Sequence, residues 1–402
     1  MQVFSQNRRF IKIFLLLAIV ALLGDFTYEG ARSFSGAFLG YLGAPVLAVG
    51  LLSLGELVMY ISRILVGILI ILRPSRKVFW ATLVVGYIVN LCVIPLLALV
   101  GRWWEALAIY IIERAGKGIR GPARDTLVSK LTEPLGRGKG FGVYELLDQI
   151  GAVTGPIALS LGIRGLGASS AFLILAPTAA LAVILVIIVF WMCRGIPVEG
   201  VGKPRVQFSF ASKILLLSVG LAAAGSLQWP LISYHLLANN IVQDYRIPLL
   251  YMLVMLSDAL AALPLGLLYD KVKTRTLLLL PLLGLMYSAL IIVVQPANLI
   301  GLTCLCLLMG VFVSCFETIV KASVADVYAG NELRGYGALA VVLSIAWSVG
   351  GLATAALYMF SLKALLVYIA VVQLACFNAV YKLCSNQGCY SRMKRQENSE
   401  NQ

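Results

Sequence analysis

Charged residues are scarce in this 402-residue sequence. Asp, Glu, Lys and Arg together make up 12% of it, whereas about a quarter of the residues of a soluble domain are charged. Histidine is rarer still, with His235 the single example. This scarcity excludes an ordinary soluble fold and a disordered chain, and a hydrophobic content of 60% indicates a protein embedded in lipid.

Signatures of catalysis and of nucleotide binding are also missing. The sequence has no Walker loop, no Gly-x-Ser-x-Gly elbow and no zinc-ligand spacing, and its eight cysteines follow no metal-binding pattern. We therefore expect no enzyme, no cofactor and no metal, and transport driven by ATP is not supported.

Long apolar runs are what the sequence has in abundance. A helix needs about 20 mainly apolar residues to cross a bilayer, so the runs predict an all-α membrane protein with twelve transmembrane helices. The expected helices cover 10–38, 45–72, 79–101, 104–130, 138–163, 169–193, 209–239, 247–269, 276–295, 298–327, 335–360 and 363–384.

The polar connection 194–208 lies midway along the chain and predicts a cytoplasmic linker. It would separate an N-terminal six-helix bundle, 1–193, from a C-terminal one, 209–385, and a polar tail, 386–402, would be disordered. A weak repeat of about 200 residues, between Gly67–Leu72 and Gly266–Lys271, predicts that the two bundles are pseudo-symmetric and have the same topology.

Basic residues outnumber acidic ones, with 32 Lys and Arg against 18 Asp and Glu. Most of the basic residues fall in alternate loops and in the tails, as the positive-inside rule predicts for both termini in the cytoplasm. The net charge of +14 is therefore interpreted as membrane topology and contact with anionic lipids, and no nucleic acid is expected. We expect a monomer in the cytoplasmic membrane.

Charges inside the expected helices recur with a period of three. The segments 10–38, 104–130, 209–239 and 298–327 are the most polar, whereas 79–101, 169–193, 276–295, 335–360 and 363–384 contain no interior charge. A charge that faces lipid costs several kcal/mol, so the polar helices should line a central water-filled path and the charge-free helices should face lipid.

Several motifs resemble those of the major facilitator superfamily. Gly266-x-x-x-Asp270-Lys271 resembles the loop signature of that family, and Arg114-x-x-Lys117-Gly118 resembles its fourth-helix motif. The resemblance implies a transporter of two six-helix bundles, in which Arg114 takes part in proton transfer. The first-half loop departs from the pattern, because Ile71 stands where the acid belongs.

The segment 138–163 is similar to the antiporter motif of drug exporters. Gly142, Gly151, Gly155 and Pro156 reproduce its spacing, although Leu159 and Ser160 replace its closing glycine pair. The similarity implies export of a solute in exchange for protons.

Proton coupling is expected at Asp25 and Glu29, with Glu113 and Arg114 as the counter-charges. Offsets of four and three residues place Asp25, Glu29 and Arg32 on one helix face. Two carboxylates beside one arginine leave one acid unbalanced, as a proton-binding site requires. The alternative is a static ion-pair network that joins this helix to its neighbours.

Other polar residues are candidates for solute binding or for an inner gate. The solute-binding candidates are Arg32, Lys117, Arg120, Glu145, Asp148, Gln228, Tyr234, His235, Asp258 and Glu317. The gate candidates, as charge pairs between cytoplasmic loops, are Asp125, Arg137, Asp270, Arg275, Asp326 and Arg334. Static pairing stays an alternative for most of them, notably for Glu317 with Lys321. Gly116, Gly118, Gly121 and Pro122 predict that the helix 104–130 is broken.

The function predicted from the sequence is secondary transport of a small organic solute by alternating access, with proton-coupled export favoured. The first alternative is a symporter or facilitator that imports an organic anion. The second is a facilitator-shaped protein that does not transport and acts as a membrane sensor or scaffold.

Overall fold

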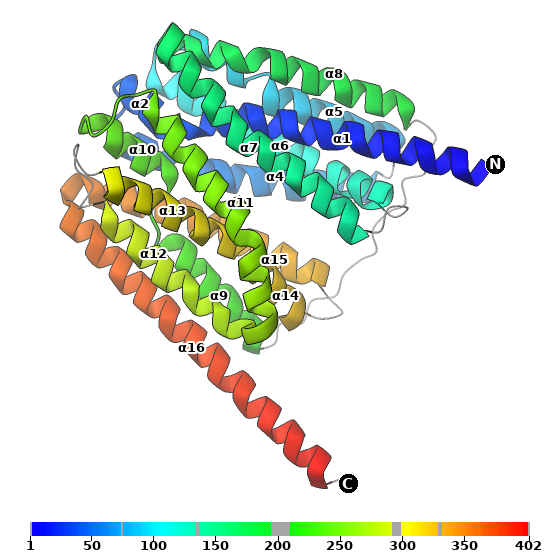
Figure 1. The fold of residues 1–402 in the computed structure, drawn as a ribbon, viewed down its shortest axis with the longest axis vertical. Coiled ribbons are helices and arrows are strands. Elements are labelled where there is room, and N and C mark those ends of the chain that lie inside the picture. Colours follow the sequence, from blue (N-terminus) through cyan, green and yellow to red (C-terminus); the bar gives the residue numbers. More distant parts are fainter. Residues whose placement is uncertain are drawn as a thin grey trace. The chain divides into compact units, whose positions relative to one another are not determined.

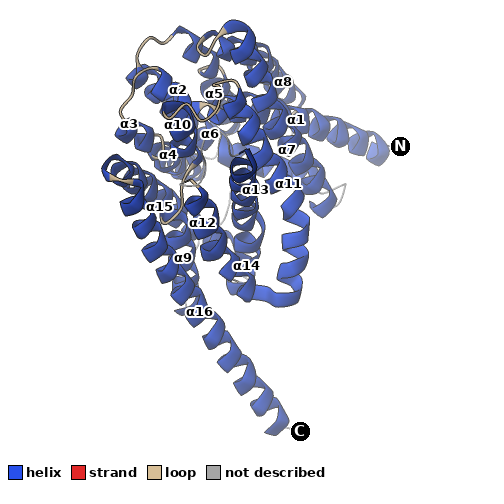
Figure 2. Ribbon diagram, turned by 60° about the vertical axis from the view of Figure 1, so that its left-hand side comes forward, coloured by secondary structure: helices blue, strands red, loops and turns tan. Residues whose placement is uncertain are grey.

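The computed structural model describes residues 2–400 except 74, 133–136, 194–209, 292–298 and 329–331; side chains are described from residue 11 to residue 385, apart from these gaps and residues 137–142 and 332–333. The described chain consists of helices and connecting loops, with no strand (Figure 2). The expected linker, 194–208, lies outside the described residues.

The first half of the chain forms helices in the order that the sequence predicts (Figure 1). They are α1 (Gln2–Ser33), α2 (Ser35–Tyr41), α3 (Val46–Leu51), α4 (Leu54–Leu72), α5 (Arg76–Leu91), η1 (Ile94–Leu99), α6 (Trp103–Thr132), α7 (Arg137–Leu166), η3 (Ser170–Leu175) and α8 (Ala176–Met192).

The second half continues in the same way. Its helices are α9 (Phe210–Ala224), α10 (Trp229–Ala238), α11 (Arg246–Val272), η4 (Lys273–Leu278), α12 (Leu279–Leu290), α13 (Leu299–Cys315), η5 (Phe316–Val320), α14 (Lys321–Val327), α15 (Glu332–Phe360) and α16 (Leu362–Glu400). The elements η1, η3 and η4 are 3₁₀ helices, and η5 is a π-helical turn.

The prediction of twelve membrane-spanning segments is confirmed. Ten stretches of the described residues are long and apolar enough to cross a membrane by length and composition. The stretch Arg246–Leu290 contains both α11 and α12, which are two of the expected spans. The remaining span is α6, which is 30 residues long but too highly charged to qualify by composition.

The outer faces of the charge-free segments are apolar and exposed. Ile184 on α8, Leu282 on α12 and Leu374 on α16 are all more than half exposed, as expected for side chains that face lipid. Exposure is not confined to these helices, because Leu65 on α4 and Leu263 on α11 are exposed to a similar extent.

The segment 209–239 is interrupted in its middle. Helix α9 ends at Ala224 and α10 begins at Trp229, so residues 225–228 are not helical. Non-helical backbone at membrane depth needs other hydrogen-bonding partners, and buried side chains provide them. The Gln373 amide donates to the carbonyls of Ala222 and Gly225, and the Tyr287 hydroxyl donates to that of Leu227.

The prediction of a broken helix over 104–130 is wrong. Helix α6 runs without interruption through Pro122. Its glycines are sites of close contact, since a Cβ added at Gly116 would collide with the backbone of Asn90 on α5 and one added at Gly118 with that of Met59 on α4. The small residues thus let α6 pack tightly between α4 and α5.

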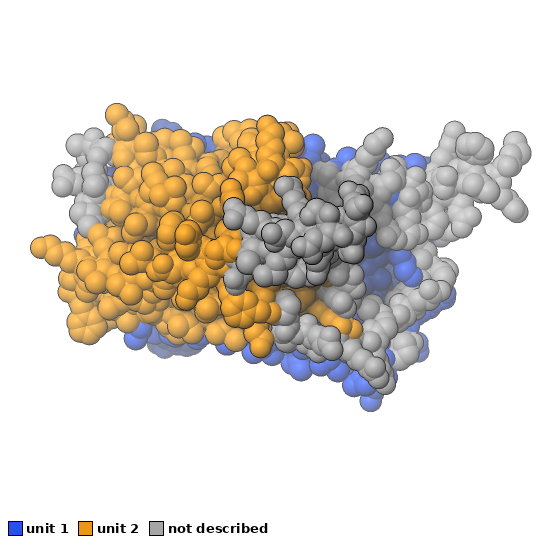
Figure 3. Space-filling model, turned by 90° about the horizontal axis from the view of Figure 1, so that it is seen from below, with its two compact units in different colours: residues 1–202, 229–255 blue, residues 203–228, 256–402 orange. Residues whose placement is uncertain are grey.

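The chain divides into two compact units, which Figure 3 colours separately. Unit 1 contains 1–202 and 229–255, and unit 2 contains 203–228 and 256–402. Unit 1 therefore includes α10 and the first ten residues of α11, in addition to the N-terminal helices. In unit 1, α1 packs on α7 and α8, and α6 packs on α4 and α5; in unit 2, α9 packs on α15 and α16.

The last helix, α16, continues to Glu400 and therefore enters the segment 386–402, for which the sequence predicts disorder. That segment is polar but has no proline, so nothing in its backbone chemistry forces the helix to end.

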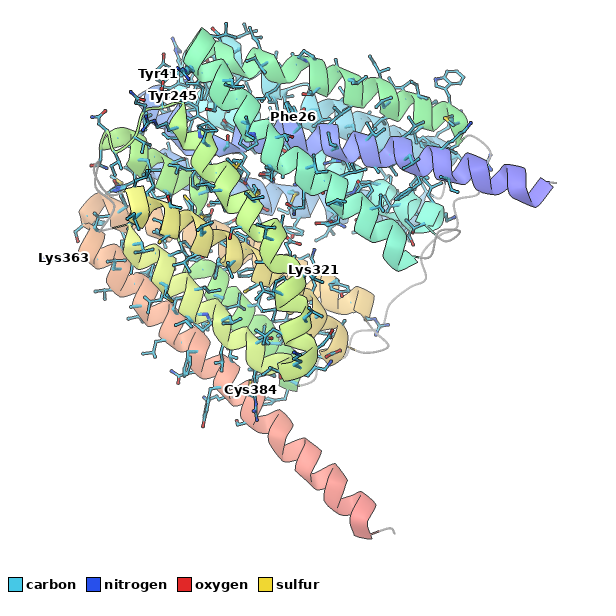
Figure 4. All side chains as sticks on the ribbon, in the orientation of Figure 1. Phe26, Tyr41, Tyr245, Lys321, Lys363 and Cys384 are labelled. Atoms are coloured by element: carbon cyan, nitrogen blue, oxygen red, sulfur yellow. The ribbon has the colours of Figure 1, made fainter. Side chains whose placement is uncertain are left out.

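The contact between α1 and α7 gives a test of the fold. A Cβ at Gly155 would meet the backbone of Phe26, which Figure 4 labels on α1, whereas one at Gly165 on the same helix would meet nothing within 4 Å. We expect Gly155→Leu to force α1 away from α7 and to destabilise the protein by about 1–3 kcal/mol or more. The measurement is the thermal unfolding midpoint in detergent.

Gly165→Leu is the matched control and should leave the midpoint unchanged or raise it slightly, because leucine favours the helix more than glycine does. Equal effects of the two substitutions would contradict the close packing of α1 on α7.

Candidate functional site

Ionisable side chains from three membrane helices of unit 1 meet in one largely buried cluster, in which Arg32, Glu56 and Lys117 are half-buried. We call it the charge cluster; its members are Asp25, Tyr28, Glu29 and Arg32 of α1, Glu56 of α4, and Glu113, Arg114 and Lys117 of α6. Burying several charges inside a membrane protein is costly unless each one has partners, so the contacts within the cluster determine what it can do.

Asp25 differs from the other acids of the charge cluster. Its carboxylate accepts a hydrogen bond from the Tyr28 hydroxyl, and it makes no ion pair with any described residue. The cation that interacts electrostatically with Asp25 is Lys117, whose Nζ lies 3.9 Å from the centre of the Tyr28 ring. Tyr28 therefore touches both the acid, through its hydroxyl, and the base, through its ring face.

Glu29 lies one turn further along α1 and is fully partnered. Arg32 Nη1 lies 3.4 Å from Glu29 Oε1, and the Tyr251 hydroxyl donates a 2.6 Å hydrogen bond to Glu29 Oε2. Tyr251 belongs to α11, 222 residues away in the sequence. Hydrogen bonds to a charged acceptor are about twice as strong as neutral ones, so this bond is a firm link between α1 and α11.

Glu56 joins the two arginines of the charge cluster. Its Oε1 lies 3.6 Å from Arg32 Nη2 and 3.6 Å from Arg114 Nη1. Arg114 also pairs with Glu113, whose Oε1 accepts a 2.6 Å hydrogen bond from the Asn90 side chain. The chain of contacts from Tyr251 through Glu29, Arg32, Glu56 and Arg114 to Glu113 is therefore continuous.

A second group of polar side chains lies one turn further along α6. The guanidinium of Arg120, 1% exposed, stands 4.3 Å from the ring centre of Tyr87. Arg120 Nε and the hydroxyls of Tyr87 and Tyr144 are buried without a hydrogen-bond partner among the described residues. Unpaired buried donors are costly, so this group is suited to receiving a polar ligand.

Helix α10 is joined to the first two helices by hydrogen bonds between side chains and backbone groups. Trp229 Nε1 donates to the Ser33 carbonyl at 2.8 Å, and the Ala37 amide donates to Ser233 Oγ at 3.2 Å. A Cβ at Gly36 would collide with the Pro230 carbonyl. His235 is buried near this contact and its Nδ1 lies 3.1 Å from Asn239 Nδ2.

The predicted site residues outside the charge cluster are dispersed. Asp148 of α7 is half-buried and close enough to Asp25 for electrostatic interaction, whereas Glu145 is exposed. Tyr234 is half-buried on α10. In unit 2, Gln228 donates to the Trp347 carbonyl and Asp258 is buried.

Glu317 and Lys321 form an ion pair at the π-helical turn, where Figure 4 labels Lys321, and both are about half exposed. The predicted pairing of these two residues is present, which makes Glu317 a weaker candidate for solute binding.

Two of the acids proposed for the inner gate have ion-pair partners among the described residues. Asp125 pairs with Arg63 and Arg124, and Asp326 accepts from the Tyr269 hydroxyl and lies 3.6 Å from Lys273 Nζ. Asp270 and Arg275 are exposed and Arg334 is half-buried, while the side chain of Arg137 lies outside the described residues. Within each unit, the acids at helix ends thus pair with bases near to them.

Sequence reasoning placed Asp25, Glu29, Glu113 and Arg114 together, and the structure does so too, with Arg32 and Lys117 beside them. It missed Tyr28, Tyr251 and Asn90, which complete the hydrogen bonding, and it left Glu56 out of the site. The charge of Glu56 inside an apolar segment was a usable signal, but tyrosines in apolar helices are too common to stand out.

Among the described residues, no three His, Cys, Asp or Glu side chains converge in a way that could hold a metal ion.

Twelve spans, an interrupted helix and a buried network of both charge signs together define a multi-pass membrane transporter.

Comparison with known proteins identifies the family. No family model matches the sequence. An uncharacterized protein of Mycobacterium bovis is 34% identical over 384 residues, which cover 91% of this chain and 90% of that protein. An uncharacterized MFS-type transporter of Methanocaldococcus jannaschii is 27% identical over 361 residues, 87% of each chain.

Solved structures have the same fold. The nucleoside transporter NupG superposes with a TM-score of 0.72 at 13% identity, covering 92% of this chain and 99% of that one. The peptide transporter POT in complex with sulfate superposes with a TM-score of 0.76 at 14% identity and 95% coverage of both chains. This chain belongs to the major facilitator superfamily, a family of secondary transporters and not of enzymes.

The central position of Glu56 can be tested by substitution. We expect Glu56→Gln and Arg114→Gln each to lower stability, by about 3–5 kcal/mol if the partner stays charged and buried. The double variant should lose less than the sum, because neither charge is then left alone. The measurement is the thermal unfolding midpoint of each variant in the same detergent.

Additive losses would contradict the pairing of Glu56 with Arg114. Arg63→Gln is the control for a cation on α4, and its exposed pair with Asp125 should contribute about 1 kcal/mol or less.

Proposed function

We propose that the protein moves a small organic solute across the cytoplasmic membrane by alternating access, coupled to protons, and that it works as an exporter. The two halves, 1–193 and 209–385, would move against each other about the linker 194–208, with both termini in the cytoplasm and one chain as the working unit. Family membership favours transport over a sensor or scaffold role.

The observation that carries the proposal is the difference between Asp25 and Glu29. Both carboxyls are buried on one face of α1, but only Glu29 has a cation as a direct partner. A buried carboxylate without an ion pair is the group of the charge cluster best suited to gain and lose a proton. Asp148 adds a further negative charge on the side of α7.

The contacts of Tyr28 suggest how protonation of Asp25 changes the contacts of the other residues in the charge cluster. While Asp25 is ionised, it accepts from the Tyr28 hydroxyl and attracts Lys117 toward the ring of Tyr28. Once Asp25 binds a proton, Lys117 loses that attraction and turns to Glu29, where it competes with Arg32.

Glu29 connects this change to the second half of the chain. Its hydrogen bond from Tyr251 weakens as the charge of Glu29 is neutralised by additional cations. We propose that release of Tyr251, together with the contacts of α10 at Ser33 and Ala37, opens the side of the protein that these contacts close. Glu113 and Arg114 would act as the counter-charges for the other ionised groups of the charge cluster.

The proposed direction follows from a motif, and the candidate solutes follow from the structural neighbours. The glycine spacing of α7 resembles that of proton antiporters and favours export. The structural neighbours include a nucleoside transporter, a peptide transporter and a POT family transporter in complex with 5-aminolevulinic acid. A screen should therefore include nucleosides, short peptides and amino acids, with sugars and carboxylic acids as further classes.

A second candidate function is import of an organic anion. The unpartnered Arg120 Nε and Tyr87 and Tyr144 hydroxyls favour it, because three buried donors would suit a carboxylate or phosphate group. Lys117 and Arg32 would add positive charge nearby. In this mode protons and solute would move in the same direction.

Proteoliposomes distinguish these functions. Solutes that stabilise the protein in a thermal-shift screen are tested for uptake under a pH gradient of either sign. Uptake driven by an acidic lumen indicates antiport, and uptake driven by an alkaline lumen indicates symport.

We expect Asp25→Asn to reduce gradient-driven uptake at least tenfold while exchange of labelled for unlabelled solute continues at equilibrium. Because the asparagine cannot bind a proton, it removes coupling without closing the solute path.

Glu105→Gln is the matched control, since this carboxylate caps backbone amides at the exposed start of α6; it should leave driven uptake unchanged. If Asp25→Asn accumulates solute like the unaltered protein, Asp25 is not the coupling group. If uptake by the wild-type protein does not depend on the pH gradient, transport is not coupled to protons.

A further variant tests the link to α11. Tyr251→Phe removes the hydroxyl that bonds to Glu29, so the contact between α10 and the first helices should open more often. With Ser233→Cys as the reporter in a cysteine-free background, we expect several-fold faster labelling by a membrane-impermeant maleimide applied from outside.

Tyr245→Phe is the control, because in the part of the chain that the structure describes the Tyr245 hydroxyl accepts a hydrogen bond from the exposed Arg246 and none of its contacts involves Glu29. Equal labelling of Tyr251→Phe and Tyr245→Phe would show that the Glu29–Tyr251 bond does not hold this contact closed.

A further inference from the structure

A surface groove of about 590 Å³ runs along unit 1 between α5 and α8. Its walls are Trp80 and Val84 of α5 and Ile187, Phe190 and Trp191 of α8, and Arg76 and Lys77 lie at one end. None of the residues used in the proposed transport function takes part in it.

The two ends of the groove differ in chemistry. At the start of α5, Arg76 and Lys77 are exposed cations on the first helical turn, where the helix dipole adds positive potential. Beyond Lys77 all the residues that line the groove are apolar. Val85 lies nine residues after Arg76, or about 14 Å along the helix at a rise of 1.5 Å per residue.

Aromatic rings line the junction between these parts. The ring centres of Trp80 and Phe190 are 5.4 Å apart and those of Phe190 and Trp191 are 5.8 Å apart, both edge to face. Tryptophan is enriched where a membrane protein crosses from the hydrocarbon layer to the lipid headgroups. The rings of Trp80, Phe190 and Trp191 therefore indicate that this end of the groove lies at the boundary between the two layers. Arg76 and Lys77 then lie among the headgroups.

A molecule that fits the groove must have a negatively charged head next to a long apolar chain. A second copy of this protein fits poorly, because a two-fold interface would bring Arg76 and Lys77 against their own counterparts. The segment Arg73–Lys77 contains three cations and no acid, so an acidic partner is what the charge favours.

We propose that the groove between α5 and α8 binds one anionic phospholipid, with the phosphate at Arg76 and Lys77 and an acyl chain along Trp80, Val84 and Ile187. The lipid comes from the leaflet into which the loop 73–75 opens, which the positive-inside rule makes the cytoplasmic one. Trp191, more than half exposed, covers the chain from the lipid side.

Native mass spectrometry of the full-length protein in detergent tests the site, with phosphatidylglycerol and phosphatidylcholine of identical acyl chains as probes. We expect the first bound phosphatidylglycerol to be held at least fivefold more tightly than phosphatidylcholine. Each cation near an anionic lipid contributes about fivefold, so Arg76→Gln with Lys77→Gln should remove this preference.

Arg73→Gln is the matched control, because it removes a charge from the same loop but does not line the groove. It should keep the preference within twofold. Trp191→Ala should weaken both lipids about equally, and Trp104→Ala, an equally exposed tryptophan elsewhere in unit 1, should weaken neither.

Three outcomes overturn the proposal: equal binding of the two lipids, unchanged preference in the double variant, or the same loss in Arg73→Gln. The last would mean diffuse attraction to the basic loop. All five substituted residues are exposed. A variant that fails to fold is recognised separately, by an altered elution volume or unfolding midpoint.

Discussion

The cost of placing charge at membrane depth is the constraint on which this structure depends. Each acid and base of the charge cluster must find its partner within protein, because lipid offers none. Glu56 satisfies two arginines at once and Glu29 satisfies an arginine and a tyrosine. Three helices are consequently bound to one another by their charges, and the arrangement can change only when one of those charges changes.

Close helix packing makes this network possible. Gly116 and Gly118 let α6 approach α5 and α4 until Asn90 reaches Glu113 and Glu56 reaches Arg114. The same residues that suggest a broken helix in the sequence therefore serve to bring charges within reach of one another. Helix propensity gave the wrong answer here because tertiary contact, not backbone freedom, decides the role of these glycines.

The fold was largely predictable, because apolar runs of membrane length and the alternation of basic loops follow directly from bilayer physics. The clustering of Asp25, Glu29, Glu113 and Arg114 was also predictable. Charged side chains on membrane helices must face the interior of the protein and not the lipid, and these four lie on two polar helices. The role of Tyr251 was not, because a hydrogen bond across 222 residues leaves no periodic trace. Ion pairs between helices, such as that of Arg63 on α4 with Asp125 on α6, likewise depend on packing that a single sequence does not reveal.

The membrane segment 209–239 is divided between the two compact units. Helix α9 belongs to unit 2, where Gln373 and Tyr368 hold its last turn, whereas α10 belongs to unit 1 through Trp229 and Ser233. The chain crosses between the units a second time inside α11, after Met255, where the backbone is helical. Torsional change between the units therefore falls more readily on residues 225–228, whose backbone is not helical.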